Sequence, residues 1–88
     1  MEVVYKDQAI DDIKFWKRSG QKIIQERISR LVEDIKLHPF TGIGKPEALK
    51  YEMSGFWSRE IDKKNRIVYK LSGEQLHIIS LLGHYLDK

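Results

Sequence analysis

A carboxylate, a histidine and fixed cations are the groups that cleavage of RNA without a metal ion requires, and this chain carries all three. One group takes the proton from a 2′-hydroxyl, another gives a proton to the departing 5′-oxygen, and cations hold the charge that grows on phosphorus. The candidates for these catalytic roles are Glu47, Arg66 and His84. Taken singly, each is more often an ordinary surface residue, so only a fold that brings them together makes them a site.

Three further residues, Lys50, Arg59 and Tyr85, are expected to bind substrate. Lys50 and Arg59 belong to residues 44–70, which hold seven basic and four acidic side chains, whereas the rest of the chain balances nine against nine. The whole net charge of +3 therefore lies in one stretch, as expected if that stretch meets a polyanion. A simple solvated turn of lysines explains the charge about equally well.

Neither a metal nor a cofactor is expected. The chain has no cysteine, and its histidines are His38, His77 and His84. If His77 and His84 share a regular strand, they lie roughly 23 Å apart and, at an odd separation, on opposite faces of the sheet. That geometry does not suit a shared ion.

Two amphipathic helices are predicted to position these groups. Asp7 can cap the first, whose apolar positions follow the i, i+4, i+7 pattern at Ala9, Ile13 and Trp16. Ser19-Gly20 breaks it. The second carries one apolar stripe, formed by Ile24, Ile28, Leu31 and Ile35. It should end near His38, because Pro39 disfavours helical geometry in the residue before it.

The remaining elements are predicted to be strands and one long loop. Val3-Val4-Tyr5 is a short β-prone run, and residues 39–55, rich in glycine and proline, form a loop long enough to suggest a function. Three antiparallel strands follow, over Phe56 to Asp62, Arg66 to Leu71, and Gln75 to Leu82. The order β-α-α-β-β-β predicts an α+β domain, with two helices on one face of a twisted, mainly antiparallel sheet.

Length and composition predict a single domain over residues 1–88. With 41% hydrophobic and 33% charged residues, the composition is that of an ordinary globular protein, and without cysteine the fold depends on packing alone. The N-terminus has an acid at its second residue and no apolar run behind it, so neither a signal peptide nor a membrane span is expected. The expected location is the cytoplasm.

Four separated motifs add a stronger signal than any single residue. They are PFTGIGKPEALK at 39–50, SGFWSR at 54–59, NRIVY at 65–69 and GHY at 83–85. Together they closely resemble the Txe/YoeB family of the RelE superfamily, and the likeness runs the whole chain, including the early Trp16 and the amphipathic second helix.

The resemblance implies a RelE-like fold and a ribosome-dependent cleavage of messenger RNA in the A site that leaves a 5′-hydroxyl on the downstream product. It implies an antitoxin of the YefM type as partner, besides the 70S ribosome and its messenger RNA, and it suggests a homodimer. Matched residue by residue, Glu47 takes the place of the general base, His84 of the general acid and Arg66 of the arginine that holds the scissile phosphate. Lys50 and Tyr85 match supporting groups.

One position departs from the family pattern. Members of the family often carry two successive arginines in the first strand of the meander, and here the second of these positions is Glu60. Arg59 cannot take over its neighbour's place, because successive strand residues point to opposite faces. Two interpretations stay open: Glu60 weakens phosphate binding, or it lies outside the site.

Two other classes of function remain as alternatives. A gyrase inhibitor of the ParE type shares the superfamily fold but lacks the acid–base set, so a large distance between Glu47 and His84 would favour it. A non-catalytic RNA- or ribosome-binding module would use the basic stretch to bind phosphates without cleaving them. Both explain the charge, but neither explains the pairing of Glu47 with His84.

Overall fold

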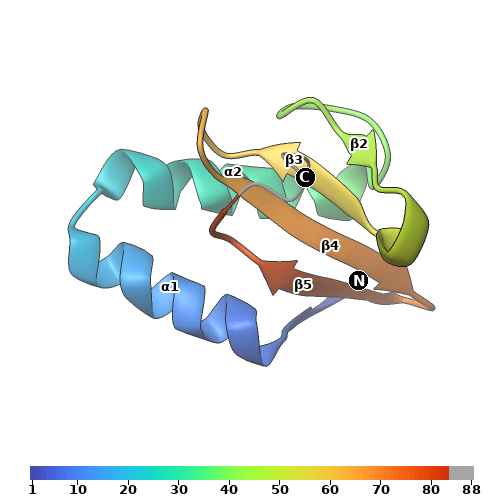
Figure 1. Cartoon of the computed structure of the whole chain (residues 1–88), viewed down its shortest axis with the longest axis horizontal. Helices are drawn as coiled ribbons and strands as arrows, with labels where there is room; N and C mark the ends of the chain where they lie inside the picture. Colours follow the sequence, from blue (N-terminus) through green and yellow to red (C-terminus); the bar gives the residue numbers. More distant parts are fainter. Residues whose placement is uncertain (84–88) are drawn as a thin grey trace.

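Two helices and a five-stranded sheet make up residues 1–83, the part of the chain that this computed structural model describes (Figure 1). The helices are α1 (Asp7–Ser19) and α2 (Lys22–Leu37), and a short 3-10 helix, η1, spans Tyr51–Met53. The strands are β1 (Glu2–Tyr5), β2 (Glu47–Ala48), β3 (Trp57–Glu60), β4 (Arg66–Ser72) and β5 (Gln75–Ser80). The predicted α+β class is confirmed.

The sheet has the strand order β1-β5-β4-β3-β2. Strands β3, β4 and β5 form the predicted antiparallel meander, while β1 lies parallel to β5 at one edge and β2 is antiparallel to β3 at the other. The sheet is therefore mixed, and it brings the first strand against the last. No helix among residues 1–83 is long and apolar enough to cross a membrane.

The core lies between the two helices and one face of the sheet. Alternation along β4 turns Ile67 and Tyr69 toward the helices, and both are fully buried. The predicted stripes supply the helical side of the same core, through Ala9, Trp16, Ile28, Leu31 and Ile35. The apolar periodicity in the sequence therefore identified the faces that pack.

Both helices end where the sequence predicts. Gly20 closes α1 in the left-handed conformation at φ 71°, and His38 closes α2 with its N–H donated to the carbonyl of Asp34 at 2.7 Å. The start of α1 differs by one residue from the prediction, because Lys6 occupies the cap position and Asp7 is the first helical residue. There its carboxylate still meets the positive end of the helix dipole.

The stretch predicted as a loop, residues 39–55, contains two short elements that the sequence did not reveal. Strand β2 pairs Glu47 with Ser58 and Ala48 with Trp57, and η1 follows it. Glu47 therefore lies on an edge strand of the sheet and not in an open loop. Two residues are too few to show alternation, so only the pairing with β3 makes this strand recognisable.

Strand β5 is shorter than predicted. It ends at Ser80 and not at Leu82, and the backbone of Leu81 turns away from β4 toward α1. The spacing estimated for His77 and His84 assumed a regular strand through both residues, so that estimate does not apply.

Candidate active site

Arg66 and Glu47, two of the three predicted catalytic residues, meet at one place on the sheet. The Nη2 atom of Arg66 lies 3.7 Å from Oε1 of Glu47. The Arg66 side chain is 6% exposed and that of Glu47 is 54% exposed, so a buried cation faces an accessible carboxylate. Strand β2 holds Glu47 against β3, and the first residue of β4 supplies Arg66.

The guanidinium of Arg66 is fixed by two partners that sequence reasoning missed. Its Nε donates to the Ser58 hydroxyl at 2.8 Å, and its Nη2 donates to the carbonyl of Lys45 at 3.2 Å and to that of Ser58 at 3.4 Å. Ser58 is the register partner of Glu47, so the three side chains share one face of the sheet. The only signal for Ser58 was its place in the SGFWSR motif.

The last described residue, Gly83, is bound to the same end of the sheet. The backbone N–H of Arg66 donates to the carbonyl of Gly83 at 3.0 Å, and the Gly83 N–H donates to Oδ1 of Asn65 at 3.0 Å. His84, the third predicted catalytic residue, and Tyr85 lie outside the described residues. The structure therefore brings together two of the three predicted catalytic groups and describes the chain up to the third.

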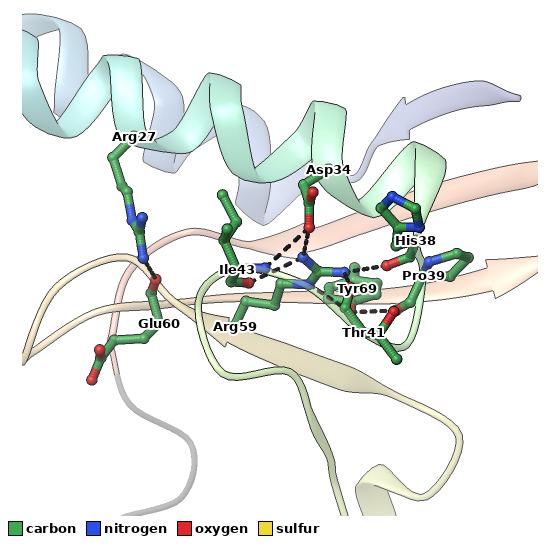
Figure 2. A network of polar contacts seen from close by, with 9 residues as sticks. All are labelled: Arg27, Asp34, His38, Pro39, Thr41, Ile43, Arg59, Glu60 and Tyr69. Atoms are coloured by element: carbon green, nitrogen blue, oxygen red, sulfur yellow. Dashed lines mark hydrogen bonds and ion pairs between the residues drawn. The ribbon is translucent and has the colours of Figure 1, made fainter.

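Arg59, which we expected to bind substrate, has a different role (Figure 2). Its side chain is fully buried, and all three of its nitrogens donate within the protein. The acceptors are the Asp34 carboxylate, the Tyr69 hydroxyl and the carbonyls of His38, Thr41 and Ile43. The prediction for Arg59 is therefore wrong, because no donor faces solvent; the residue holds the segment after α2 onto the sheet.

Asp34 is the charged partner that makes the burial of Arg59 possible. Its carboxylate accepts from Arg59 Nη1 at 2.5 Å and from the N–H of Ile43 at 3.2 Å. The hydrogen bond from Arg59 is the main cause that holds the pKa of Asp34 below its ordinary value. Sequence reasoning missed this residue, although Asp34 lies three positions after Leu31 and borders the apolar stripe of α2.

Tyr69 completes the same network from the centre of the sheet. Its hydroxyl donates to the carbonyl of Pro39 at 2.7 Å and accepts from Arg59 Nε at 3.2 Å. Burial raises the pKa of the Tyr69 phenol, so the ring stays neutral and keeps its proton for the donated bond.

The segment after α2 approaches this network so closely that one position requires glycine. Gly42 has φ +119°, and a Cβ added there would meet Oδ2 of Asp34 at 2.1 Å. The segment then continues through Lys45, whose carbonyl binds Arg66, to Glu47 on β2. Residues 42–47 therefore lead directly from the buried Asp34–Arg59 ion pair to Glu47 in the candidate site.

Glu60, the departure from the family pattern, lies on the opposite face from Arg59. It is the register partner of Arg66, so the two share a face, and Figure 2 shows its carboxylate pointing away from the Arg59 guanidinium. Both of its backbone polar groups are hydrogen-bonded. Its carbonyl accepts from Nη2 of Arg27 at 3.3 Å, and its N–H donates to the carbonyl of Gly44 at 2.6 Å. Glu60 therefore lies on the same face of the sheet as Arg66.

The basic stretch divides into buried and exposed cations. Arg59 and Arg66 are buried, and Lys70 places its ammonium 5.1 Å from the centre of the Phe56 ring. The cations of residues 44–70 that stand exposed are Lys45, Lys50, Lys63 and Lys64. The fully exposed positive charge of this stretch is thus smaller than the sequence count suggests, and all of it is lysine.

A surface cavity of about 610 Å³ lies beside the turn between β3 and β4. Its walls include Phe15 and Trp16 from α1, Lys63 and Lys64 from the turn, and Leu82. The carboxylate of Asp62 is hydrogen-bonded within the turn, since it accepts from the backbone N–H groups of Lys64 and Asn65. Within residues 1–83, no three histidine, aspartate or glutamate residues gather as metal ligands would.

A family model for the YoeB-like toxin of bacterial type II toxin–antitoxin systems matches residues 5–85. The chain belongs to this family. The resemblance seen in its motifs is confirmed by a relative, the toxin YoeB of Streptomyces coelicolor, which is 42% identical over 85 residues, covering 97% of this chain and 100% of the relative.

Solved structures of YoeB-family toxins agree with the fold. A YoeB/ParE toxin from Agrobacterium tumefaciens superposes with a TM-score of 0.90 at 40% identity, over 97% of this chain and 100% of that one. YoeB from Staphylococcus aureus, solved as a dimer and in complex with YefM, gives TM-scores of 0.88 and 0.86 at 31% identity over 97% of this chain and 98% of each of those chains. This chain is therefore a YoeB-type toxin in sequence and in architecture.

The Asp34–Arg59 pair generates a prediction about stability and pH. Replacing Asp34 by Asn should lower the free energy of unfolding at pH 7 by about 3 kcal/mol, the low end for breaking a buried ion pair, because Asp34 keeps 23% of its side chain exposed. Since its pKa is lowered on folding, the contribution is complete above the unfolded value of 3.8 and is lost as pH falls through the folded value.

Urea unfolding of the wild type and D34N between pH 7 and pH 2 measures this difference. The two curves should converge only below about pH 4. Asp11→Asn, at an exposed position of α1, is the matched control and should follow the wild type. A difference that stays constant down to pH 2 would contradict the assignment.

Proposed function

We propose that this toxin is a ribosome-dependent endoribonuclease, which cleaves messenger RNA in the A site of the 70S ribosome and thereby inhibits translation. The observation that carries the proposal is the approach of the exposed Glu47 carboxylate to the buried Arg66 guanidinium, at 3.7 Å. A proton acceptor beside a fixed cation is the arrangement that an attack on a phosphodiester needs. Family membership makes RNA the expected substrate.

In the proposed reaction, Glu47 takes the proton of the 2′-hydroxyl and that oxygen attacks the adjacent phosphorus. The bond from phosphorus to the 5′-oxygen of the next nucleotide breaks, and His84 gives this oxygen a proton. The products are a 2′,3′-cyclic phosphate and a 5′-hydroxyl. Lys50 and Tyr85 are proposed to support the bound nucleotide.

Arg66 is proposed to hold the charge that develops on the phosphate oxygens. Its Nε and Nη2 are committed to Ser58, Lys45 and Glu47, whereas Nη1 makes no hydrogen bond within residues 1–83. Because the guanidinium is already fixed, it needs no reorganisation when the substrate reacts. An exposed lysine at this position would lack that rigidity.

The assignment of His84 is supported by the chain that leads to it. Gly83 is bound to the backbone of Arg66, and His84 is the next residue in the chain. A histidine at this position of the sequence suits the role of proton donor.

The ribosome is proposed to supply the geometry that free RNA lacks. Attack requires the 2′-oxygen, the phosphorus and the leaving oxygen in line, and an unconstrained strand seldom holds them so. A codon clamped in the A site satisfies this condition. The exposed lysines Lys63 and Lys64 are proposed to dock on ribosomal RNA, which also places the site of action in the cytoplasm.

Two protein partners are proposed from the relatives. The YoeB of Staphylococcus aureus was solved with YefM and as a dimer. We infer that this chain likewise binds a YefM-type antitoxin and forms a homodimer.

The proposed acid–base pair is tested on programmed ribosomes. Glu47→Gln and His84→Ala should each lower the single-turnover cleavage rate at least about 10²-fold, because each removes a proton-transferring group. Glu52→Gln, on η1, and His77→Ala, on β5, are matched controls that should cleave normally. Mapped 5′-ends identify the product. Equal cleavage of naked and ribosome-bound RNA, or no cleavage by the wild type, would overturn the proposal.

A second experiment tests whether a divalent ion takes part in the chemical step. Because Glu47, His84 and Arg66 supply base, acid and cation, chelation of free divalent ions should leave the single-turnover rate unchanged. The ribosomal complexes are assembled first and kept intact with cobalt hexammine and spermidine. A rate that falls on intact complexes and returns only with added metal would contradict the prediction.

If Lys63 and Lys64 dock on ribosomal RNA, replacing them should change ribosome binding but not the cleavage rate. The double variant Lys63→Ala/Lys64→Ala should weaken ribosome binding and reduce the slope of log K against log salt by up to about 2. The rate on saturated ribosomes should not change. Lys6→Ala/Lys14→Ala, which removes the same charge from exposed positions, is the control. Equal salt slopes for both double variants would reject the docking role.

A further inference from the structure

The residue that follows β5 has both of its backbone polar groups bound by side chains of α1. The N–H of Leu81 donates to Oδ2 of Asp12 at 2.8 Å, and its carbonyl accepts from the indole Nε1 of Trp16 at 2.9 Å. All three residues are buried, with Asp12 only 2% exposed. Asp12 and Trp16 are four positions apart, so one face of α1 presents both groups.

This arrangement is unusual because it places a carboxylate in the core. Aspartate is seldom buried this far without a charged partner, and no ion pair to Asp12 is found within residues 1–83. Its other oxygen accepts from the side-chain amide of Gln8 at 2.8 Å. The pairing of β4 with β5 stops at Ser80, and Asp12 and Trp16 bind the backbone of the next residue, Leu81.

The other end of the same short segment is bound to the candidate site. The carbonyl of Gly83 accepts from the N–H of Arg66, and its N–H donates to Asn65. Gly83 has φ +87°, which favours glycine, although a Cβ there would meet no atom within 4 Å. Residues 81–83, called the arch from here on, are therefore fixed at both ends, by α1 at the start and by the beginning of β4 at the close.

We propose that Asp12 and Trp16 are positioning residues for the cleavage reaction, which act by fixing the arch, the segment that directly precedes His84 in the chain. The inference rests on the proposed function. Neither residue touches the substrate. A general acid attached to a mobile segment would sample many positions, and a misplacement of about 1 Å can cost 10²-fold in rate. The buried carboxylate and the indole N–H remove that freedom.

Three variants separate the two hydrogen bonds from the packing of α1. Asp12→Ala removes the acceptor of the Leu81 N–H, Asp12→Asn keeps one acceptor oxygen, and Trp16→Phe keeps an aromatic ring but loses the indole N–H. In single-turnover assays on programmed ribosomes, D12A should lower the rate at saturation by about 10- to 10²-fold. Its half-saturating ribosome concentration should stay unchanged, D12N should recover most of the rate, and W16F should fall between them.

A purely structural role is excluded by a matched control and a second readout. Ile35→Val lowers stability from a buried position of α2 and removes no hydrogen bond to the arch. All assays run well below the melting temperature of every variant. Amide hydrogen exchange at Leu81 reports the arch directly, and D12A should lose that protection while the central strand β4 keeps its own.

The outcomes distinguish this inference from the proposed function. If the wild type cleaves and D12A cleaves equally fast although the Leu81 amide exchanges freely, positioning is overturned. A rate loss in D12A that I35V reproduces at equal melting temperature also overturns it, as does a loss confined to ribosome binding. If the wild type itself does not cleave, the proposed function fails and the inference fails with it.

Discussion

A fully buried guanidinium organises the region that holds the candidate site. Taking a charge out of water is costly unless a counter-charge and a full set of hydrogen bonds replace the solvent. Arg59 has both, since Asp34 supplies the charge and three carbonyls and a phenol accept the remaining bonds. Those carbonyls belong to the segment that leads to Glu47. The position of the proposed base therefore depends on an interaction on the opposite face of the sheet.

The two arginines of the meander lie on neighbouring strands but bind different partners. Arg59 and Arg66 lie on strands that pair with each other, but alternation sends their side chains to opposite faces. Every side-chain nitrogen of Arg59 donates to an acceptor within the protein. Arg66 is held by Ser58 and Lys45 and also faces the exposed carboxylate of Glu47. Residue type alone does not tell them apart. Their positions relative to the core do.

Much of the fold could be predicted from the sequence, because apolar periodicity and glycine or proline breaks are local signals. The stripe through Ile28 and Leu31 identified the buried face of α2, and Gly20 identified the end of α1. The misses were long-range. Strand β2 exists only through its pairing with β3, and Arg59 changes role only because Asp34, 25 residues earlier, lies opposite it. Charges counted along a sequence do not reveal which of them are neutralised in the interior.

The parallel pairing of β1 with β5 has a consequence for how the protein acquires its shape during synthesis. Glu2 lies opposite Gln75 and Tyr5 opposite Ile78, so the first strand has no neighbour in the sheet until almost the whole described chain has been made. Chain growth at about 5–20 residues per second leaves β1 without its sheet partner for several seconds. The helices can form early, but the sheet closes only after β5 emerges. The end of the sheet that carries Arg66 is completed just as late, because the backbone of Arg66 binds Gly83.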